Sequence, residues 1–574
     1  MASTDRAHAR VPEQELRLRL AAERDRLERA AGLGPRPAHY RRPTERPFTR
    51  EHREAARILF FGLTAKHERL IQAALGGLGH DAEPLPTPDV EAFQVGREYG
   101  NNGQCNPNYF TVGSLVKHLQ GLEDRGSTRQ QLIDRYVMVT AGACGPCRFG
   151  MYESEYRLAL HNAGFDGFRV ALFDKDSGLD QVGRGAGIDF GVDFFLALLN
   201  AIVVGDLLND LSYQIRPFEV VPGETDRVMA ECLDRVGEVF GDGPAAPSRW
   251  LRRAASAVPG RPGRADQVAA VVAQLRDPRF VRVLGEVRDR LGEVRVDRTR
   301  VRPVVKVTGE FWAQTTEGDG NFRMFEFLER EGAQVVVEPM STWITYLLAQ
   351  TRQRNLDRRG IGPDRAVRAR GDWLGRLVDD VRVRRANAPL GVAERAFVRE
   401  WERYRKALGG QAHPLADQYE LQRMAHPYYN TRAAGGEGHL EVAKNLYYST
   451  HGLCHMVVSL KPFGCMPSTQ SDGVQSAVTS HYPDMVYLPV ETSGEGEVNA
   501  HSRVQMALGD ARAKCNAELE QALRDTGLGL DDVREVAAQR PVLTRATYRV
   551  PRVPGVAGTA ATFTRHVADL VGTG

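Results

Sequence analysis

Short runs of apolar residues recur along this chain and are separated by stretches of helical composition. Each run has the length of one buried strand, and most intervening segments are long enough for a helix. Strands that alternate with helices in this way pair in parallel, because the helix carries the chain back across the sheet. The runs are residues 57–63, 136–140, 169–173, 303–307, 334–338, 455–460 and 485–489. The sequence therefore predicts an α/β fold with two or three Rossmann-like, doubly wound parallel-sheet domains, helical insertions and a helical N-terminal arm.

Changes in composition divide the chain into six segments. Residues 1–55 are rich in arginine, glutamate and alanine, and residues 225–300 have few strand signals. The predicted organisation is a basic helical N-terminal arm or linker (1–55), a first α/β domain carrying Cys105 and a Cys-Gly-Pro-Cys motif (56–224), a helical connector (225–300), a second α/β domain with a helical insertion (301–434), a third α/β unit carrying Cys465 (435–540) and a C-terminal tail (541–574).

The bulk composition limits the class of protein. A chain of 574 residues is too long for one hydrophobic core, and a formal net charge of +3 is small for that length. So small a charge gives no reason to expect nucleic acid or an anionic membrane as a partner. The N-terminus lacks the apolar segment of a secretory signal, and no window approaches ~18 uninterrupted apolar residues. We therefore expect a cytoplasmic protein without a membrane span, whose seven cysteines are ligands, catalysts or buried apolar residues rather than disulfides.

The motif Cys144-Gly145-Pro146-Cys147 follows an apolar run and precedes a predicted helix. The free N–H groups of a helix N-terminus favour thiolate, which is both the nucleophile of disulfide exchange and a ligand for soft metals. One interpretation is a thioredoxin-like thiol–disulfide oxidoreductase, although Ala143 stands where that motif usually has an aromatic residue. A second is structural zinc, although a closed four-thiolate site usually takes two short-range cysteine pairs and this chain has one.

The third interpretation is an iron–sulfur cluster held by thiolates from different loops, and it also accounts for Cys105 and Cys465. Both lie in loops rich in glycine or proline, where the backbone can approach a cluster closely. Such loops lie outside the carboxyl ends of parallel strands, where ligands bind, so loops from two domains could converge on one crevice. We therefore expect a [4Fe–4S] cluster bound by Cys105, Cys144, Cys147 and Cys465. Of the other cysteines, Cys232 and Cys515 are expected to be buried in helices, and Cys454 is a further candidate ligand.

Several charged residues in neighbouring loops are candidates for chemistry or tuning. Glu310 and Glu495 follow apolar runs and are candidate acid/base groups, with the alternative that such acids only begin helices. His501, with Arg503, could hold an anionic ligand or act in catalysis, with the alternative of a helix-surface pair. Arg148 and Lys461 could tune a cluster's potential by placing positive charge beside it.

Four motifs, in order along the chain, resemble one known family. They are Gly100-Asn-Asn-Gly-Gln-Cys105, Ala141-Gly-Ala-Cys-Gly-Pro-Cys-Arg-Phe-Gly150, Thr308-Gly-Glu-Phe-Trp312 and Lys461-Pro-Phe-Gly-Cys-Met-Pro-Ser468. They resemble the 2-hydroxyacyl-CoA dehydratase (2-hydroxyglutaryl-CoA dehydratase D-component) family, and most closely its acyl-CoA dehydratase activase-related branch. The resemblance implies Rossmann-like domains around a [4Fe–4S] or double-cubane cluster ligated by Cys105, Cys147 and Cys465. Cys144 departs from the wider family's pattern, and as a fourth ligand it would close the iron position that the dehydratases use for substrate.

The resemblance also implies a function and partners. Family members accept a low-potential electron from an ATP-hydrolysing activator of the actin/sugar-kinase superfamily and pass it to a bound acyl-CoA, which is then dehydrated or reduced. This chain has no phosphate motif of those activators, so the activator is expected to be a separate chain. A homo- or heterodimer is expected. The alternative from another class is a non-catalytic, cluster-carrying electron-transfer subunit.

Overall fold

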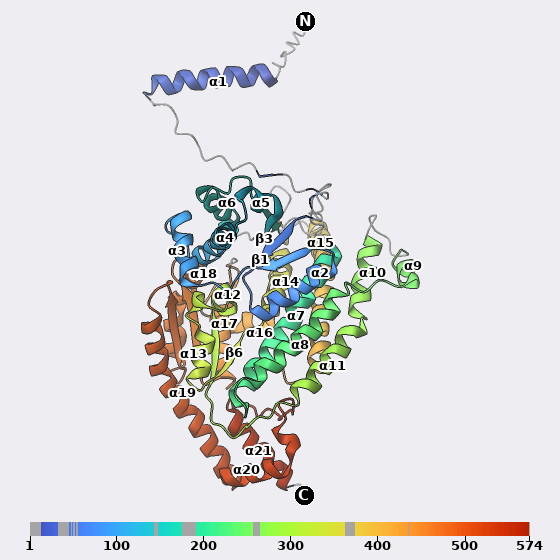
Figure 1. The fold of residues 1–574 in the computed structure, drawn as a ribbon, viewed down its shortest axis with the longest axis vertical. Coiled ribbons are helices and arrows are strands. Elements are labelled where there is room, and N and C mark those ends of the chain that lie inside the picture. The colour runs from blue at the N-terminus through green and yellow to red at the C-terminus, as the bar shows by residue number, and fades with distance from the viewer. Residues whose placement is uncertain are drawn as a thin grey trace. The chain divides into compact units, whose positions relative to one another are not determined.

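A computed structural model describes residues 13–32, 45–46, 49, 52, 55–142, 147–174, 191–256, 264–361, 373–433 and 436–572. The chain forms two units, Met1–Thr44 and Glu45–Gly574. The described part of the first unit is one helix, α1 (Glu13–Ala30), whose leucines at 18, 20 and 27 are exposed. The second unit contains all the strands and every other helix described below (Figure 1).

The first sheet has four parallel strands in the order β2-β1-β3-β4. Its strands are β1 (Arg57–Phe60), β2 (Asp81–Pro84), β3 (Tyr136–Gly142) and β4 (Arg169–Asp174). The helices between and after them are α2 (Ala65–Gly77), α3 (Val90–Tyr99), α4 (Asn106–Asp124), α5 (Arg129–Arg135), the short 3₁₀ helix η2 (Arg148–Met151) and α6 (Tyr152–Asn162). Three of these strands match predicted runs, whereas β2 is not among those runs.

The second sheet repeats the same strand order, β6-β5-β7-β8, and is again wholly parallel. Its strands are β5 (Val304–Gly309), β6 (Gln334–Val337), β7 (Met456–Pro462) and β8 (Tyr487–Thr492). Its helices are α12 (Phe311–Thr315), the 3₁₀ helix η5 (Asp319–Asn321), α13 (Met324–Arg330), α14 (Met340–Asp357), α16 (Gln418–Ala425), α17 (Leu440–Thr450), α18 (Met466–His481) and α19 (Glu497–Thr526). Strands from the predicted second domain and from the predicted third unit thus join in one sheet. The described residues therefore contain two parallel sheets, consistent with an α/β fold.

Helices cover both faces of each sheet, because alternate side chains of a strand point to opposite faces. In the first sheet Ile58 and Phe60 pack toward α2 and other helices in one core, while Leu59 belongs to a core on the opposite face. In the second sheet Val305 and Val307 pack against α13 and α19. The opposite face of that sheet lies under α17.

A further set of helices lies outside the segments described so far, and most of them come between β4 and β5 in the sequence. They are α7 (Val192–Ile215), the 3₁₀ helix η4 (Arg216–Phe218), α8 (Glu224–Gly241), α9 (Arg249–Ser256), α10 (Arg264–Leu275), α11 (Pro278–Leu291) and, after the second sheet's β6, α15 (Trp373–Ala407). The residues predicted as a connector are therefore largely helical. α7 packs against α2 beside the first sheet and against β6 of the second sheet, so it connects the two sheets. The first half and the second half of the protein are the parts of the chain that contain the first sheet and the second sheet.

α7 has apolar residues on all of its faces, which is typical of a helix that is buried on most sides. Among the described helices, only the stretch Val192–Phe218 is long and apolar enough to cross a membrane, with a mean hydropathy of 1.7 in its most apolar window. Within the protein 61% of that window is buried. The same length and composition occur in a core helix.

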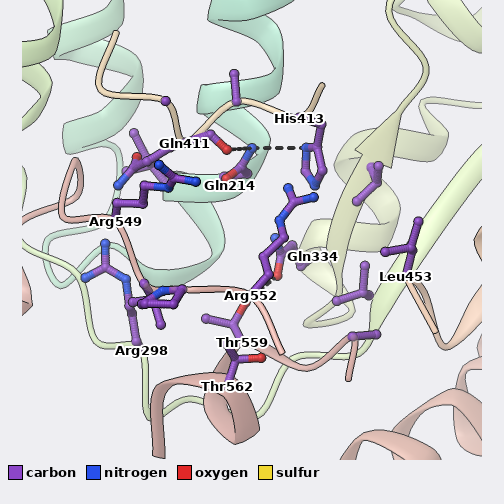
Figure 2. A pocket seen from close by; sticks show the side chains of 18 of the residues that line it. Gln214, Arg298, Gln334, Gln411, His413, Leu453, Arg549, Arg552, Thr559 and Thr562 are labelled. Carbon is purple, nitrogen blue, oxygen red and sulfur yellow. Dashed lines mark hydrogen bonds between the residues drawn. The ribbon is translucent and has the colours of Figure 1, made fainter. Parts of the chain in front are cut away.

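The C-terminal segment closes against the second sheet. It contains α20 (Leu530–Gln539), the 3₁₀ helix η6 (Pro541–Thr544) and α21 (Thr559–Gly572), which packs on α19. The guanidinium of buried Arg298 donates hydrogen bonds to four carbonyls of this segment, those of Leu543, Arg545, Ala546 and Tyr548. Residues 546–562 then form one wall of a cavity of about 570 Å³ (Figure 2).

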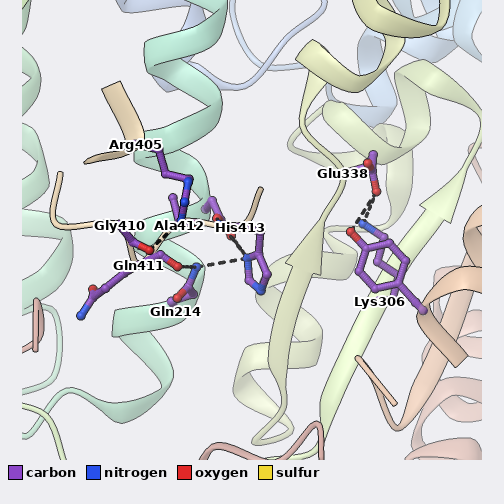
Figure 3. Close-up of polar contacts among 10 residues, drawn as sticks. Gln214, Lys306, Glu338, Arg405, Gly410, Gln411, Ala412 and His413 are labelled. Atoms are coloured by element: carbon purple, nitrogen blue, oxygen red, sulfur yellow. Dashed lines mark hydrogen bonds and ion pairs between the residues drawn. The ribbon is translucent and has the colours of Figure 1, made fainter. Parts of the chain in front are cut away.

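A buried ion pair lies under α17. Lys306 Nζ of β5 is 2.7 Å from Glu338 Oε2, and both side chains are almost fully buried (Figure 3). Thr342 donates to the other carboxylate oxygen at 2.7 Å, and the ring of Tyr448 lies 4.2 Å from the lysine nitrogen. Each of these buried charges depends on the other, because burial removes the water that would otherwise stabilise it.

Candidate functional site

A cavity of about 290 Å³ lies at the carboxyl ends of strands from both sheets. Its walls include residues 60–63 after β1, residues 139–141 of β3, residues 310–312 after β5 and residues 465–467 after β7. In each sheet these two strands are the neighbours between which the winding direction reverses. Such reversal points are where open α/β sheets bind ligands, and here two of them face one cavity.

Three cysteines line this cavity, and each immediately precedes a helix. Cys105 is the N-cap of α4, Cys147 of η2 and Cys465 of α18. None of the three makes a regular side-chain capping hydrogen bond. Pro107 and Pro467 in the first turns of α4 and α18 favour the start of a helix at these points. The structure places these three cysteines in the wall of one cavity; Cys144 lies outside the described residues.

The loops of Cys105 and Cys465 contact each other directly. The backbone N–H of Asn106 donates to the carbonyl of Phe463 at 3.0 Å. Gly464 has a φ of +76°, and a Cβ at this position would lie 3.3 Å from the Cα of Cys105. Glycine is therefore needed here both for the left-handed turn and for the close approach of the two chain segments.

Substituting this glycine is expected to destabilise the protein. Gly464→Ala should lower the free energy of unfolding by about 1–2 kcal/mol, because alanine is strained at positive φ and its methyl group crowds Cys105. Gly473→Ala is the matched control, since Gly473 lies within α18 with no atom within 4 Å of an added Cβ. Urea denaturation of both variants checks this, and an unchanged midpoint for Gly464→Ala would contradict the close contact.

Burial dominates the electrostatics of the three thiols. It raises the pKa of Cys147 to about 12 and raises the pKa of Cys465 further, and nearby carboxyl groups add to both shifts. The pKa of Cys105 is also raised by burial, although the hydroxyl of Tyr152, 3.0 Å from its sulfur, partly opposes this. Burial therefore favours the protonated form of all three thiols.

Three buried or partly buried carboxyl groups share the cavity wall: those of Glu68, Glu310 and Glu437. Burial raises the pKa of Glu68 to about 8, that of Glu310 to about 7 and that of Glu437 well above its ordinary value. Glu310 also caps α12, where its carboxylate accepts from the N–H of Ala313 at 2.9 Å. Of these three, only Glu310 was predicted as a site residue. Glu437 lies in a glycine-rich loop, which is a weak signal, and Glu68 had no signal in the sequence.

The two predicted cationic residues have different surroundings. Arg148 lines the cavity, and its guanidinium donates to the carbonyl of Gly103 in the Cys105 loop. Lys461 does not line it. The lysine nitrogen lies 2.6 Å from carboxylate oxygens of both Glu441 and Asp472, so its charge is already paired within the second half.

Glu495 and His501 do not line the cavity. Glu495 is exposed in the loop before α19. The ring of His501 stacks on Phe327 at 3.8 Å, and its Nε2 lies 2.8 Å from the carbonyl of Phe322. Both residues were predicted as site residues because they follow an apolar run. That run is β8, an outer strand of the sheet, whereas the cavity lies beyond the two strands at the reversal point, β5 and β7.

The remaining cysteines fall elsewhere. Cys232 on α8 and Cys515 on α19 are buried, which confirms the prediction for them. Cys454 is not part of the cavity wall, and burial raises its pKa to about 12.

The residues at the cavity fit a thiolate-bound group. Thiolate is a soft ligand suited to iron–sulfur clusters, and three thiols from three loops reach the same space. Glu437 Oε1 and Trp312 Nε1 are buried without a hydrogen-bond partner among the described residues. In the same part of the chain, no group of three or more His, Cys, Asp or Glu side chains is arranged to hold a metal ion.

Together these features define the class: an α/β protein with a cysteine-lined cavity between the reversal points of two parallel sheets. No protein-family model matches the chain, and no curated protein matches it. The family resemblance of the four motifs therefore stays a prediction.

Proposed function

We propose that this protein holds an iron–sulfur cluster in the cysteine-lined cavity, accepts a low-potential electron from a separate ATP-hydrolysing activator and passes it to a small bound substrate of the acyl-CoA type. The observation that carries the proposal is that Cys105, Cys147 and Cys465 precede three different helices and line one cavity. A cluster in this place would supply single-electron chemistry at low potential.

The chain's own residues would serve that chemistry in distinct ways. Cys105, Cys147 and Cys465 would bind the cluster, and the N–H groups of the following helix turns would offset the negative charge of the thiolates. Arg148 places a positive charge beside the Cys105 loop. Glu310, with a pKa of about 7, can give or accept a proton in the cavity near neutral pH.

The walls of the cavity would exclude water from the reacting groups. They are largely apolar and include Phe60, Phe194 and Trp312. A charged intermediate in such surroundings is stabilised by fixed protein groups instead of solvent. The volume of about 290 Å³ is at the lower end of the range for small-molecule sites, roughly 300–1,000 Å³.

Two alternatives predict different results. A thiol–disulfide oxidoreductase would use the Cys144–Cys147 pair alone, which leaves Cys105 and Cys465 without a role. A cluster-carrying electron-transfer subunit needs no substrate space beside the cysteines.

Oxygen-free purification of the full chain tests the proposal. We expect a brown protein with about four irons and about four acid-labile sulfides per chain, and a paramagnetic signal after chemical reduction. A colourless, iron-free protein with a reversible dithiol would overturn it in favour of disulfide exchange. Adding a 2-hydroxyacyl-CoA to the reduced protein should change the paramagnetic signal, whereas a signal indifferent to every acyl-CoA tried would favour the electron carrier.

A further inference from the structure

A second, larger cavity lies at the opposite edge of the second sheet. We name it the arginine cavity; it is lined by Arg298, Arg405, Arg549 and Arg552 together with His413 and residues near the amino ends of β5 and β6, Val304 and Gln334 (Figure 2). Its volume is about 570 Å³, within the range of small-molecule sites, roughly 300–1,000 Å³. Among the described residues, its wall contains no aspartate or glutamate. Four arginines therefore line a cavity whose wall itself contributes no carboxylate.

Two of these arginines have structural partners. Arg298 holds the C-terminal segment through four backbone carbonyls. Arg405 forms an ion pair with Glu402 at 2.9 Å and donates to the carbonyls of Gly410 and Ala412 (Figure 3). Their guanidinium groups build the wall of the cavity.

The other two arginines have no such role. Arg549 and Arg552 make no hydrogen bond or ion pair within the described part of the chain, and both are exposed to the cavity solvent. In Figure 2, Arg552 extends from the C-terminal segment toward His413. Two unpaired guanidinium groups that share one cavity offer up to ten N–H donors to a ligand.

The surroundings of Arg552 are electrostatically unfavourable for a cation. Arg552 keeps part of its surface exposed, but the partial burial of its guanidinium lowers its pKa, and the charges of Arg405 and Arg549 add to that shift. The nearest acid, Asp210, attracts Arg552 but is already bound to His413, whose Nδ1 lies 2.8 Å from its carboxylate. An anion bound between these arginines would remove their mutual repulsion.

The rest of the wall suits an organic group. The rings of Tyr447, Tyr448 and Tyr548 line it, and the amides of Gln214 and Gln334 supply hydrogen-bonding groups. Aromatic rings offer faces for a planar base or sugar, and guanidinium groups bind phosphate through two parallel hydrogen bonds. A cavity with both features fits a phosphorylated molecule with an organic body.

We propose that the arginine cavity binds a nucleoside-diphosphate-type ligand, with its phosphates on Arg549 and Arg552 and its organic body against the tyrosines. The site uses residues of the C-terminal segment and lies at the amino ends of the strands, whereas the cysteines lie at the carboxyl ends. The inference therefore does not depend on the proposed function.

Calorimetric titration of the full chain with ADP tests the proposal, and it requires no iron. We expect saturable binding that becomes at least about tenfold weaker in Arg549→Gln and in Arg552→Gln, because each change removes hydrogen bonds between charged groups. Arg540→Gln is the matched control, since Arg540 is exposed, lies on the same segment and is outside the cavity wall. It removes the same charge and should leave the affinity within about twofold.

Three further ligands test the role of the arginines and the role of the tyrosines separately. Adenosine should bind at least about tenfold more weakly than ADP, and so should pyrophosphate, because each lacks half of the proposed contacts. Equal binding of adenosine would overturn the role of the arginines, and equal binding of pyrophosphate would overturn the organic body. Absence of binding by ADP, pyrophosphate and inorganic phosphate alike at millimolar concentration would overturn the site, as would ADP binding that both arginine variants leave unchanged.

Discussion

Replacing Cys465 by serine is expected to abolish iron retention in protein purified without oxygen. Cys465 precedes α18 in the second half, whereas Cys105 and Cys147 come from the first half, so its thiol is the second half's contribution to the ligand set. Serine has a similar size but is a hard, neutral oxygen ligand that a soft cluster does not accept. Cys147→Ser should give the same result. We expect the iron content to fall from about four to less than about one atom per chain.

A matched control comes from a cysteine of similar burial in another core. Cys232 lies on α8 and is 3% exposed, compared with 7% for Cys465. Cys232→Ser should therefore retain full iron, as measured by metal and sulfide analysis of both variants side by side. Full iron in Cys465→Ser would show that the two halves do not share a cluster.

The largest effect on stability is expected from removing one member of the buried pair under α17. Lys306→Met should lower the free energy of unfolding by about 3–5 kcal/mol, because it leaves Glu338 buried without its directly paired cation. Lys406→Met, on the exposed face of α15, is the matched control and should change stability by less than about 0.5 kcal/mol.

A double substitution separates the lost charge from the lost packing. Lys306→Met combined with Glu338→Gln removes both charges, and the amide can keep the hydrogen bond from Thr342. We expect it to recover more than half of the stability that Lys306→Met loses, as measured by the urea midpoint. A double variant no more stable than the single one would contradict an ionised pair.

Most of the strands were predictable because a strand buried on both faces is a continuous apolar run. β2 was missed for the opposite reason. Two of its four residues, Asp81 and Glu83, are charged, and it lies at the edge of the sheet, where proline is tolerated and one side of the strand is unpaired. The placement of β7 beside β5, with β8 on its other side, could not be predicted from local sequence, because the long helix α15 separates β6 from both strands in sequence.

The candidate site was predictable only in part. Loops after strands share one edge of a parallel sheet, and this rule places Cys147 after β3 and Cys465 after β7 at one cavity; Cys105 lies between α3 and α4, so the rule does not place it there. Glu68 enters the cavity from a helix, so only the packing of that helix places it there. The arginine cavity gave no signal, because arginine is frequent throughout the chain and the residues involved come from distant segments.

The common strand order of the two sheets makes some positions of the chain topologically equivalent. Numbered within its own sheet, β3 corresponds to β7, and each is the third strand of a 2-1-3-4 arrangement. Cys147 follows β3 and Cys465 follows β7, so these cysteines occupy the same position in two repeats of one architecture. Cys105 has no such counterpart: it lies between α3 and α4, in the segment that connects β2 to β3, whereas the chain from β6 to the end of α17 contains no cysteine. Two of the three thiols in the cavity are thus related by the internal repeat. Cys105 has no equivalent, so a group bound in the cavity would meet an extra thiol on the side of the first half only.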